Sequence, residues 1–123
     1  MMIDGVAGVI IWTENMGAMT EFYRDTLRLP VHSERPHFVA FEWGEMRFSI
    51  GEHSEVKGTN AEPDRIMVNF GTPDIHALHE RLTAAGVRFV RPPEREHWGG
   101  WVATFEDPDG NHLQLLEQPG DGF

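Results

Sequence analysis

A carboxylate, a guanidinium and a hydroxyl occur together in one short stretch of the chain. In FVAFEWGEMRFSIG (38–51), the dipeptide at 44–45 fits a two-residue turn, because glycine suits the first central position of a type II′ turn. That turn pairs Glu42 with Arg47 on one face of a β-hairpin and places Ser49 on the same face. The alternate residues are apolar and belong against a helix. A carboxylate beside a guanidinium could bind a ligand or move a proton.

A second stretch offers an imidazole and an amide in a similar pattern. HLQLLE (112–117) alternates polar and apolar residues, so His112 and Gln114 share one face of a strand. Glu42, Arg47 and His112 are candidates for an acid or base, although the sequence does not decide whether the site is catalytic. We expect a small-molecule-binding cleft lined by Trp12, Glu42, Arg47, Ser49, Met67, Asn69, Trp98, His112 and Gln114.

Two tryptophans lie in or beside the loop that precedes the last hairpin, in REHWGGWVATFE (95–106). Large apolar rings seldom lie on loops without a use. We expect Trp98 to stack on a planar ligand, and Trp101, which begins a strand, to lie in the core or in a dimer contact.

The elements that must position these residues are repeated in the chain. At an offset of 59 residues, GVIIWTENM (8–16) aligns with MVNFGTPDI (67–75), and both read as a strand that leads into a helix. Asn15 and Asp74 occupy the N-cap positions of the two helices, and Gly86 fits a left-handed cap at the end of the second. Each helix is followed by a strand and then by a hairpin.

The repeat predicts a single α+β domain (1–123) of two tandem βαβββ modules, about 4–55 and 62–118. A module of this size covers only one face of its own sheet. We therefore expect the two modules to pack together as a curved mixed sheet around a cleft.

Composition narrows the classes of partner. The chain has 123 residues, a formal charge of −10 and no cysteine. This charge argues against nucleic acid, because phosphate contacts need a basic surface. No apolar run approaches the length of a membrane span, and the start MMIDGVAGVI lacks the basic region of a secretion signal, so we expect a cytoplasmic protein with no membrane partner.

Three segments resemble a known family: EFYRDTL (21–27), AAGV (84–87) and FEDPDGNHLQLLE (105–117). Together with the repeat, they resemble the vicinal-oxygen-chelate superfamily, which includes glyoxalases, bleomycin-resistance proteins and extradiol dioxygenases. The resemblance implies a glyoxalase/bleomycin-resistance-like fold, a ligand cleft and a homodimer. Arg28 departs from the family, which often has glycine after the first helix. A left-handed non-glycine there would cost about 1 kcal/mol.

The resemblance also implies metal ligands at four strand positions. In this chain those positions hold Gly8, Ser49, Met67 and Gln114. Glycine and methionine supply no hard oxygen or imidazole, and serine and glutamine are poor ligands for a divalent ion. We therefore predict that no metal binds there and that the protein uses no cofactor.

Three functions follow as hypotheses. The first is a metal-free binding protein of the glyoxalase/bleomycin-resistance type that sequesters a drug or metabolite; the negative charge would suit a cationic ligand. The second is a lyase, isomerase or dioxygenase, either metal-dependent or with an atypical site. The third is an interaction subunit with an unused cleft.

Overall fold

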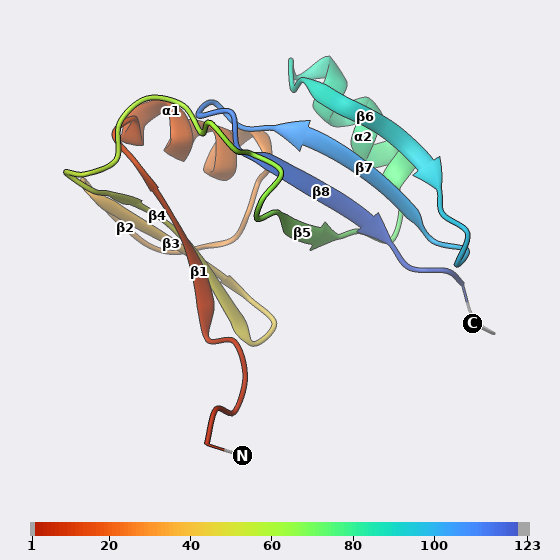
Figure 1. Cartoon of the computed structure of the whole chain (residues 1–123), viewed down its shortest axis with the longest axis horizontal. Coiled ribbons are helices and arrows are strands. Elements are labelled where there is room, and N and C mark those ends of the chain that lie inside the picture. The colour runs from red at the N-terminus through yellow and green to blue at the C-terminus, as the bar shows by residue number, and fades with distance from the viewer. Residues whose placement is uncertain (1, 121–123) are drawn as a thin grey trace. The chain divides into compact units, whose positions relative to one another are not determined.

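The chain forms two compact units, Met1–Gly58 and Thr59–Phe123. Its structure is a computed structural model that describes residues 2–120 (Figure 1). The division falls in the polar segment between the two expected modules, and each unit is described by itself. Within residues 2–120, no helix is long and apolar enough to cross a membrane.

The first unit is one βαβββ module. Its elements are β1 (Gly8–Thr13), α1 (Met16–Thr20), the π-helix η1 (Glu21–Thr26), β2 (Val31–Arg35), β3 (Phe38–Trp43) and β4 (Met46–Glu52). The strands form a mixed sheet in the order β1-β4-β3-β2, in which β1 is parallel to β4 and the other pairs are antiparallel.

The second unit repeats this connectivity. Its elements are β5 (Val68–Gly71), α2 (Ile75–Ala84), β6 (Phe89–Arg95), β7 (Trp101–Glu106) and β8 (His112–Glu117), and the sheet order is β5-β8-β7-β6. The register is conserved between the units, since Val9 pairs with Phe48 and Val68 pairs with Leu113. The predicted α+β fold of two tandem βαβββ modules is confirmed.

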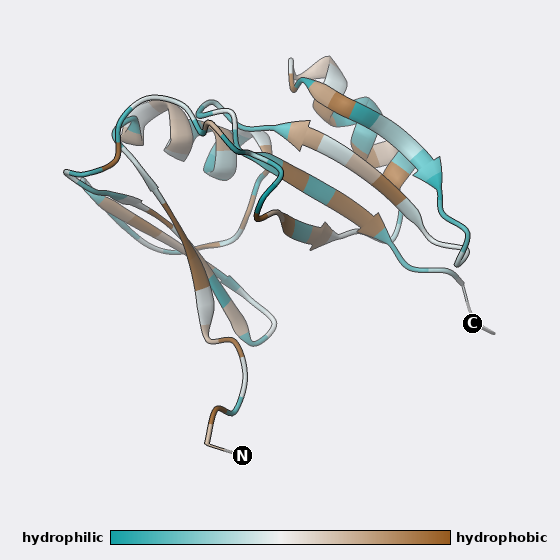
Figure 2. Ribbon diagram, in the orientation of Figure 1, coloured by the Kyte–Doolittle hydropathy of each residue, from teal (hydrophilic) through white to brown (hydrophobic). Residues whose placement is uncertain are grey.

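Each module has its core between one face of the sheet and the helix. In the first module Met19 and Tyr23 are fully buried, and the Tyr23 ring lies 5.2 Å from that of Phe48. In the second, Leu82 of α2 and Phe105 of β7 are fully buried. Hydrophobic residues accordingly follow the strands, while the connecting loops are largely hydrophilic (Figure 2).

The two helices end in related ways, with one difference. Gly86 has a φ of +92°, and the amides of Gly86 and Val87 donate to the carbonyls of Thr83 and Leu82, which is the Schellman arrangement. Arg28 adopts the same left-handed region with a φ of +61°. Arg28 therefore adopts, as expected, a left-handed backbone conformation that glycine would adopt without strain.

The helix starts differ from each other. Asp74 caps α2, because its carboxylate accepts a hydrogen bond from the Ala77 amide at 3.1 Å. Asn15 occupies the N-cap of α1 but its side chain makes no capping hydrogen bond. Instead, Thr13 Oγ1 accepts from the Asn15 amide at 2.8 Å. Residues 16–27 also depart from the single helix expected, since the second half is a π-helix in which the Leu27 amide donates to the Phe22 carbonyl.

Candidate functional site on the polar sheet faces

The β3–β4 hairpin has the register predicted from its turn. Glu42 pairs with Arg47 and Ala40 with Ser49, and Gly44 has a φ of +59°, as a type II′ turn requires. Arg47 Nη2 donates to Glu42 Oε2 at 2.7 Å, and this hydrogen bond holds the pKa of Glu42 below its ordinary value. The expected carboxylate–guanidinium pair therefore forms on the face of the sheet away from α1.

Trp12 lies at the other end of the first module's sheet. Its ring crosses Gly51, where a Cβ atom would come within 2.5 Å of the indole. The ring also contacts Phe38 and His53, with centroid separations of 6.1 and 5.4 Å. Ser49 lies between the two ends and is 2% exposed. The structure thus places Trp12 in an aromatic cluster, apart from the Glu42–Arg47 pair.

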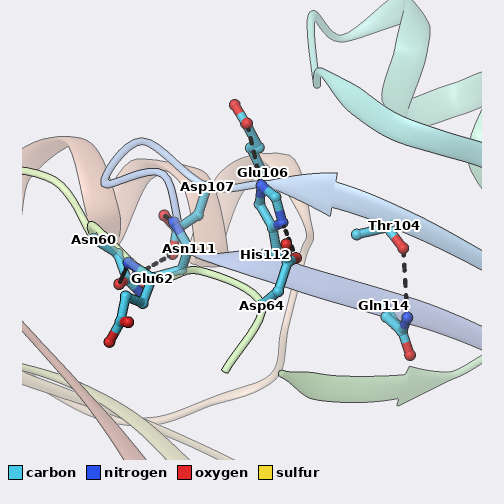
Figure 3. A network of polar contacts seen from close by, with 9 residues as sticks. All are labelled: Asn60, Glu62, Asp64, Thr104, Glu106, Asp107, Asn111, His112 and Gln114. Carbon is cyan, nitrogen blue, oxygen red and sulfur yellow. Dashed lines mark hydrogen bonds and ion pairs between the residues drawn. The ribbon is translucent and has the colours of Figure 1, made fainter. Parts of the chain in front are cut away.

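The second module carries a cation–carboxylate pair at the equivalent strand positions. Glu106 pairs with His112 across β7 and β8, as Glu42 pairs with Arg47 across β3 and β4. His112 Nε2 lies 3.3 Å from Glu106 Oε1, and its Nδ1 lies 2.5 Å from Asp64 Oδ1 (Figure 3). Sequence reasoning selected His112 but missed both carboxylates.

The arrangement around His112 determines the charge of its imidazole. A neutral imidazole has one N–H donor, whereas ionised carboxylates only accept hydrogen bonds. Both ring nitrogens of His112 can donate, one to Asp64 and one to Glu106, only when the ring is protonated. Burial lowers the pKa of His112, but the hydrogen bonds to Asp64 and Glu106 outweigh it and raise the pKa above its ordinary value.

Asp64 reaches His112 because the segment before β5 is fixed on the β7–β8 turn. Asn60 Nδ2 donates to Asn111 Oδ1 at 2.9 Å (Figure 3). The Asn60 backbone amide also donates to the Asp109 carbonyl at 2.9 Å. The turn itself is held by Asp107, whose Oδ1 accepts from the amides of Asp109 and Asn111. The DPDGN turn therefore serves to dock the segment that carries Asp64.

A row of polar residues crosses all four strands of the second sheet. Asn69, Gln114, Thr104 and Arg91 are successive register partners on β5, β8, β7 and β6. Gln114 Nε2 lies 3.4 Å from Thr104 Oγ1 (Figure 3). The predicted residues Asn69 and Gln114 are thus brought together with His112 on one face. Met67 precedes the first residue of β5.

Arg91 is a second cation held by two carboxylates, and sequence reasoning missed it. Its guanidinium donates through Nε to Glu94 and through Nη2 to Glu96, the latter at 2.5 Å. The hydrogen bond to Glu94, followed by that to Glu96, raises the pKa of Arg91. The alternation of arginine and glutamate in RPPERE (91–96) was the available signal.

Trp98 packs against its own loop. A Cβ atom at Gly100 would lie 1.9 Å from the Trp98 indole and 2.8 Å from the Glu117 carbonyl oxygen. Two backbone hydrogen bonds close the loop, from the Glu96 amide to the Gly100 carbonyl and from the Gly99 amide to the Glu96 carbonyl. Ligand stacking by Trp98 stays a prediction. Trp101 instead contacts His76 of α2, with ring centroids 4.5 Å apart.

The four positions implied by the family do not fit a metal ion. A side chain cannot be added at Gly8 without movement, because its Cβ would lie 2.5 Å from the Arg47 carbonyl oxygen. Ser49 and Gln114 supply at most neutral oxygens. Among residues 2–120, no three histidine, aspartate or glutamate side chains are grouped so that they could hold a metal.

Comparison with known proteins identifies the family. The model of the Glyoxalase/Bleomycin resistance protein/Dioxygenase superfamily matches residues 5–115. The chain belongs to this superfamily. YetH of Bacillus subtilis, an uncharacterized protein, is 25% identical over 123 residues, covering 94% of this chain and 100% of YetH.

Solved structures agree with this assignment to the superfamily. A protein of unknown function from Agrobacterium tumefaciens is 28% identical with a TM-score of 0.76, and the match covers 93% of this chain and 94% of that one. A superfamily member from Sphaerobacter thermophilus is 25% identical with a TM-score of 0.73, covering 96% and 100%. The expected resemblance is confirmed at the level of family and fold.

Proposed function

We propose that the protein is a metal-free, small-molecule-binding member of the superfamily, and that the polar face of the second sheet holds its ligand. The observation that carries the proposal is the charge on this face. His112 and Arg91 are each bonded to two carboxylates, from Asp64 and Glu106 and from Glu94 and Glu96. Glu106 is also paired with Arg88 at 3.8 Å, so four carboxylates face three cations around the neutral hydrogen-bonding pair of Thr104 and Gln114.

This charge selects the class of ligand. An anion would find no uncommitted cation among these seven charged groups, whereas a cation would meet a surplus of one carboxylate. The formal charge of −10 for the whole chain acts in the same direction by attracting cations over longer distances. The proposed ligand is thus a small organic cation that also hydrogen-bonds to Gln114.

A homodimer and a cytoplasmic location are further parts of the proposal, and sedimentation at micromolar concentration tests the dimer.

Three planar probes of nearly equal size test the ligand class: benzamidine is a cation, benzamide is neutral and benzoate is an anion. We expect benzamidine to raise the melting temperature most and benzoate least. Glu106→Gln should weaken benzamidine binding, while Glu45→Gln, on the β3–β4 turn, should leave it unchanged. Stabilisation by benzoate equal to or above that by benzamidine would refute the proposed charge selection.

An enzyme is the second candidate, and one observation favours it. Carboxylates on both ring nitrogens of His112 favour its protonated form and raise its pKa, and a protonated imidazole is the form that a general acid requires. Incubation of a bound ligand with the protein, followed by NMR of the recovered molecule, separates the two functions. An unchanged ligand supports binding alone, whereas conversion that is lost in His112→Gln supports catalysis.

A further inference from the structure

The first module has a groove between its helix and the end of its edge strand. Residues of α1 and η1 form one wall, Glu34 and Arg35 of β2 form the other, and Val39 lies between them. The cavity has a volume of about 510 Å³, which is within the range of small-molecule sites. It lies on the helix side of the sheet and uses none of the residues assigned above to the ligand face.

The floor of the groove is apolar, and the groove has unfilled space beside Gly17. Val39 is 1% exposed and closes the bottom of the groove, so Met16 and Pro36, which also line it, supply the apolar surface open to a ligand. Gly17 also lines the groove, and a Cβ atom built there would meet no atom within 4 Å. The absence of a side chain at Gly17 therefore leaves space that an apolar ligand group can fill.

The two walls are tied together by one guanidinium. Arg24 of η1 donates from Nε and Nη2 to the Asp25 carboxylate at 2.8 and 2.9 Å. Its Nη1 donates to Glu34 of β2 at 2.7 Å. The bidentate pair with Asp25 orients the guanidinium within the helix wall, and the bond to Glu34 crosses to the strand wall. Arg24 is thus occupied by carboxylates of the two walls.

Two further charges on the groove have no protein partner. Glu21 stands on the helix wall and Arg35 on the strand wall. Among residues 2–120, neither side chain makes a hydrogen bond or ion pair. Opposite charges on opposite walls, above an apolar floor, are complementary to a molecule that has a positive group at one end and a negative group at the other.

We propose that this groove binds short free peptides with apolar side chains, the simplest being a dipeptide. The peptide ammonium pairs with Glu21, its carboxylate pairs with Arg35, and its side chains cover Met16 and Pro36 and fill the space above Gly17. The terminal charges of an extended dipeptide are separated by roughly 7 Å, so they can pair with two different side chains. In a free amino acid both charged groups are attached to the same carbon, so a dipeptide can pair with charges on opposite walls more readily than a free amino acid can.

Three forms of one dipeptide test the proposal: leucyl-leucine, its N-acetyl derivative and its C-terminal amide. Binding is measured from the shifts of backbone amide resonances in the full chain. We expect leucyl-leucine to shift the amides of Gly17, Glu21 and Arg35, and both blocked forms to bind at least tenfold more weakly. Absence of shifts at these residues with millimolar leucyl-leucine, or equal binding of the blocked forms, would overturn the proposal.

Variants separate the parts of the site. Gly17→Leu should fill the groove and abolish binding, whereas Gly17→Ala should retain it; the Cβ atom that both replacements add meets no atom within 4 Å. Glu21→Gln should remove the difference in affinity between the free and the acetylated peptide. Arg35→Gln should remove the difference in affinity between the free peptide and its amide. Glu45→Gln is the matched control. Unchanged preferences in both charge variants would show that Glu21 and Arg35 do not bind the termini.

Discussion

The imidazole Nδ1 of His112 lies 2.5 Å from Oδ1 of Asp64, although the two residues are 48 positions apart in the chain. The histidine side chain is 12% exposed, whereas that of the aspartate is 76% exposed. A nearly buried imidazolium therefore has one of its two carboxylate partners on a segment that faces water. This contact should be sensitive both to pH and to replacement of the aspartate.

Replacement of Asp64 by Asn should lower the pKa of His112, because an amide does not stabilise the imidazolium as a carboxylate does. A histidine whose pKa is raised on folding stabilises the protein fully at a pH below its unfolded-state pKa, which is about 6.5. This stabilisation is lost as the pH rises through the folded-state pKa. Urea unfolding from pH 6 to 9 should thus show a smaller decline in stability for Asp64→Asn than for the parent. Since Asp64 is exposed, we expect Asp64→Asn to lower the free energy of unfolding by only about 0.5–1 kcal/mol at pH 6.

Glu62→Gln is the control for this experiment, because Glu62 lies in the same segment and pairs with Arg65 rather than with His112. Its pH profile should match that of the parent. A His112 resonance that titrates identically in the parent and in Asp64→Asn would contradict the assignment.

Gly100→Ala should destabilise the protein by about 1–3 kcal/mol, since the added methyl group overlaps the Trp98 ring. The loss should be smaller when Trp98 is already Ala, although the Glu117 carbonyl still crowds the site. Thermal unfolding of both single variants and the double variant measures this coupling. Gly71→Ala is a matched control, because its Cβ would meet no atom within 4 Å. Additive effects would show that Trp98 does not pack on Gly100.

Arg28→Gly should stabilise the protein by up to about 1 kcal/mol, because glycine adopts a positive φ without strain. Gly86→Ala is the reciprocal change at the end of α2 and should destabilise by a similar amount. Chemical denaturation of the two variants compares the same helix-end position in the two modules. A loss of stability in Arg28→Gly would mean that the arginine side chain contributes more than its backbone strain removes.

No divalent metal should bind at Gly8, Ser49, Met67 and Gln114. We expect less than stoichiometric zinc, nickel, iron or manganese in protein purified without chelator, and no change in melting temperature with EDTA. The physical reason is that at most two neutral oxygens could approach an ion at these positions. One equivalent of metal whose removal lowers the melting temperature would contradict the prediction.

Local patterns predicted the hairpins and the repeat, because both depend on residues close in sequence. The pairing of Glu42 with Arg47 followed from a two-residue turn, and the left-handed cap at Gly86 followed from its residue type. The π-helix Glu21–Thr26 was missed, since the spacing of Met19, Tyr23 and Leu27 also fits an α-helix.

The polar partners at the site were harder to predict than the strands that carry them. Asp64 belongs to an irregular segment with no periodicity, and only the docking of Asn60 on the β7–β8 turn brings it to His112. Arg91 follows a register shift between β6 and β7, so strict alternation does not assign its neighbours. Contacts that depend on loops or bulges leave little trace in the order of residues.

The equivalence of Glu42–Arg47 and Glu106–His112 has an evolutionary consequence. The paired side chains differ between the modules, yet in both they lie on the sheet face away from the helix. The cores, which include Tyr23, Phe48, Leu82 and Phe105, lie on the other face, between the sheet and the helix. Recognition groups can therefore be exchanged by mutation while the interior keeps its packing. A duplicated scaffold of this kind can acquire a new ligand in one half while the other half retains its original chemistry.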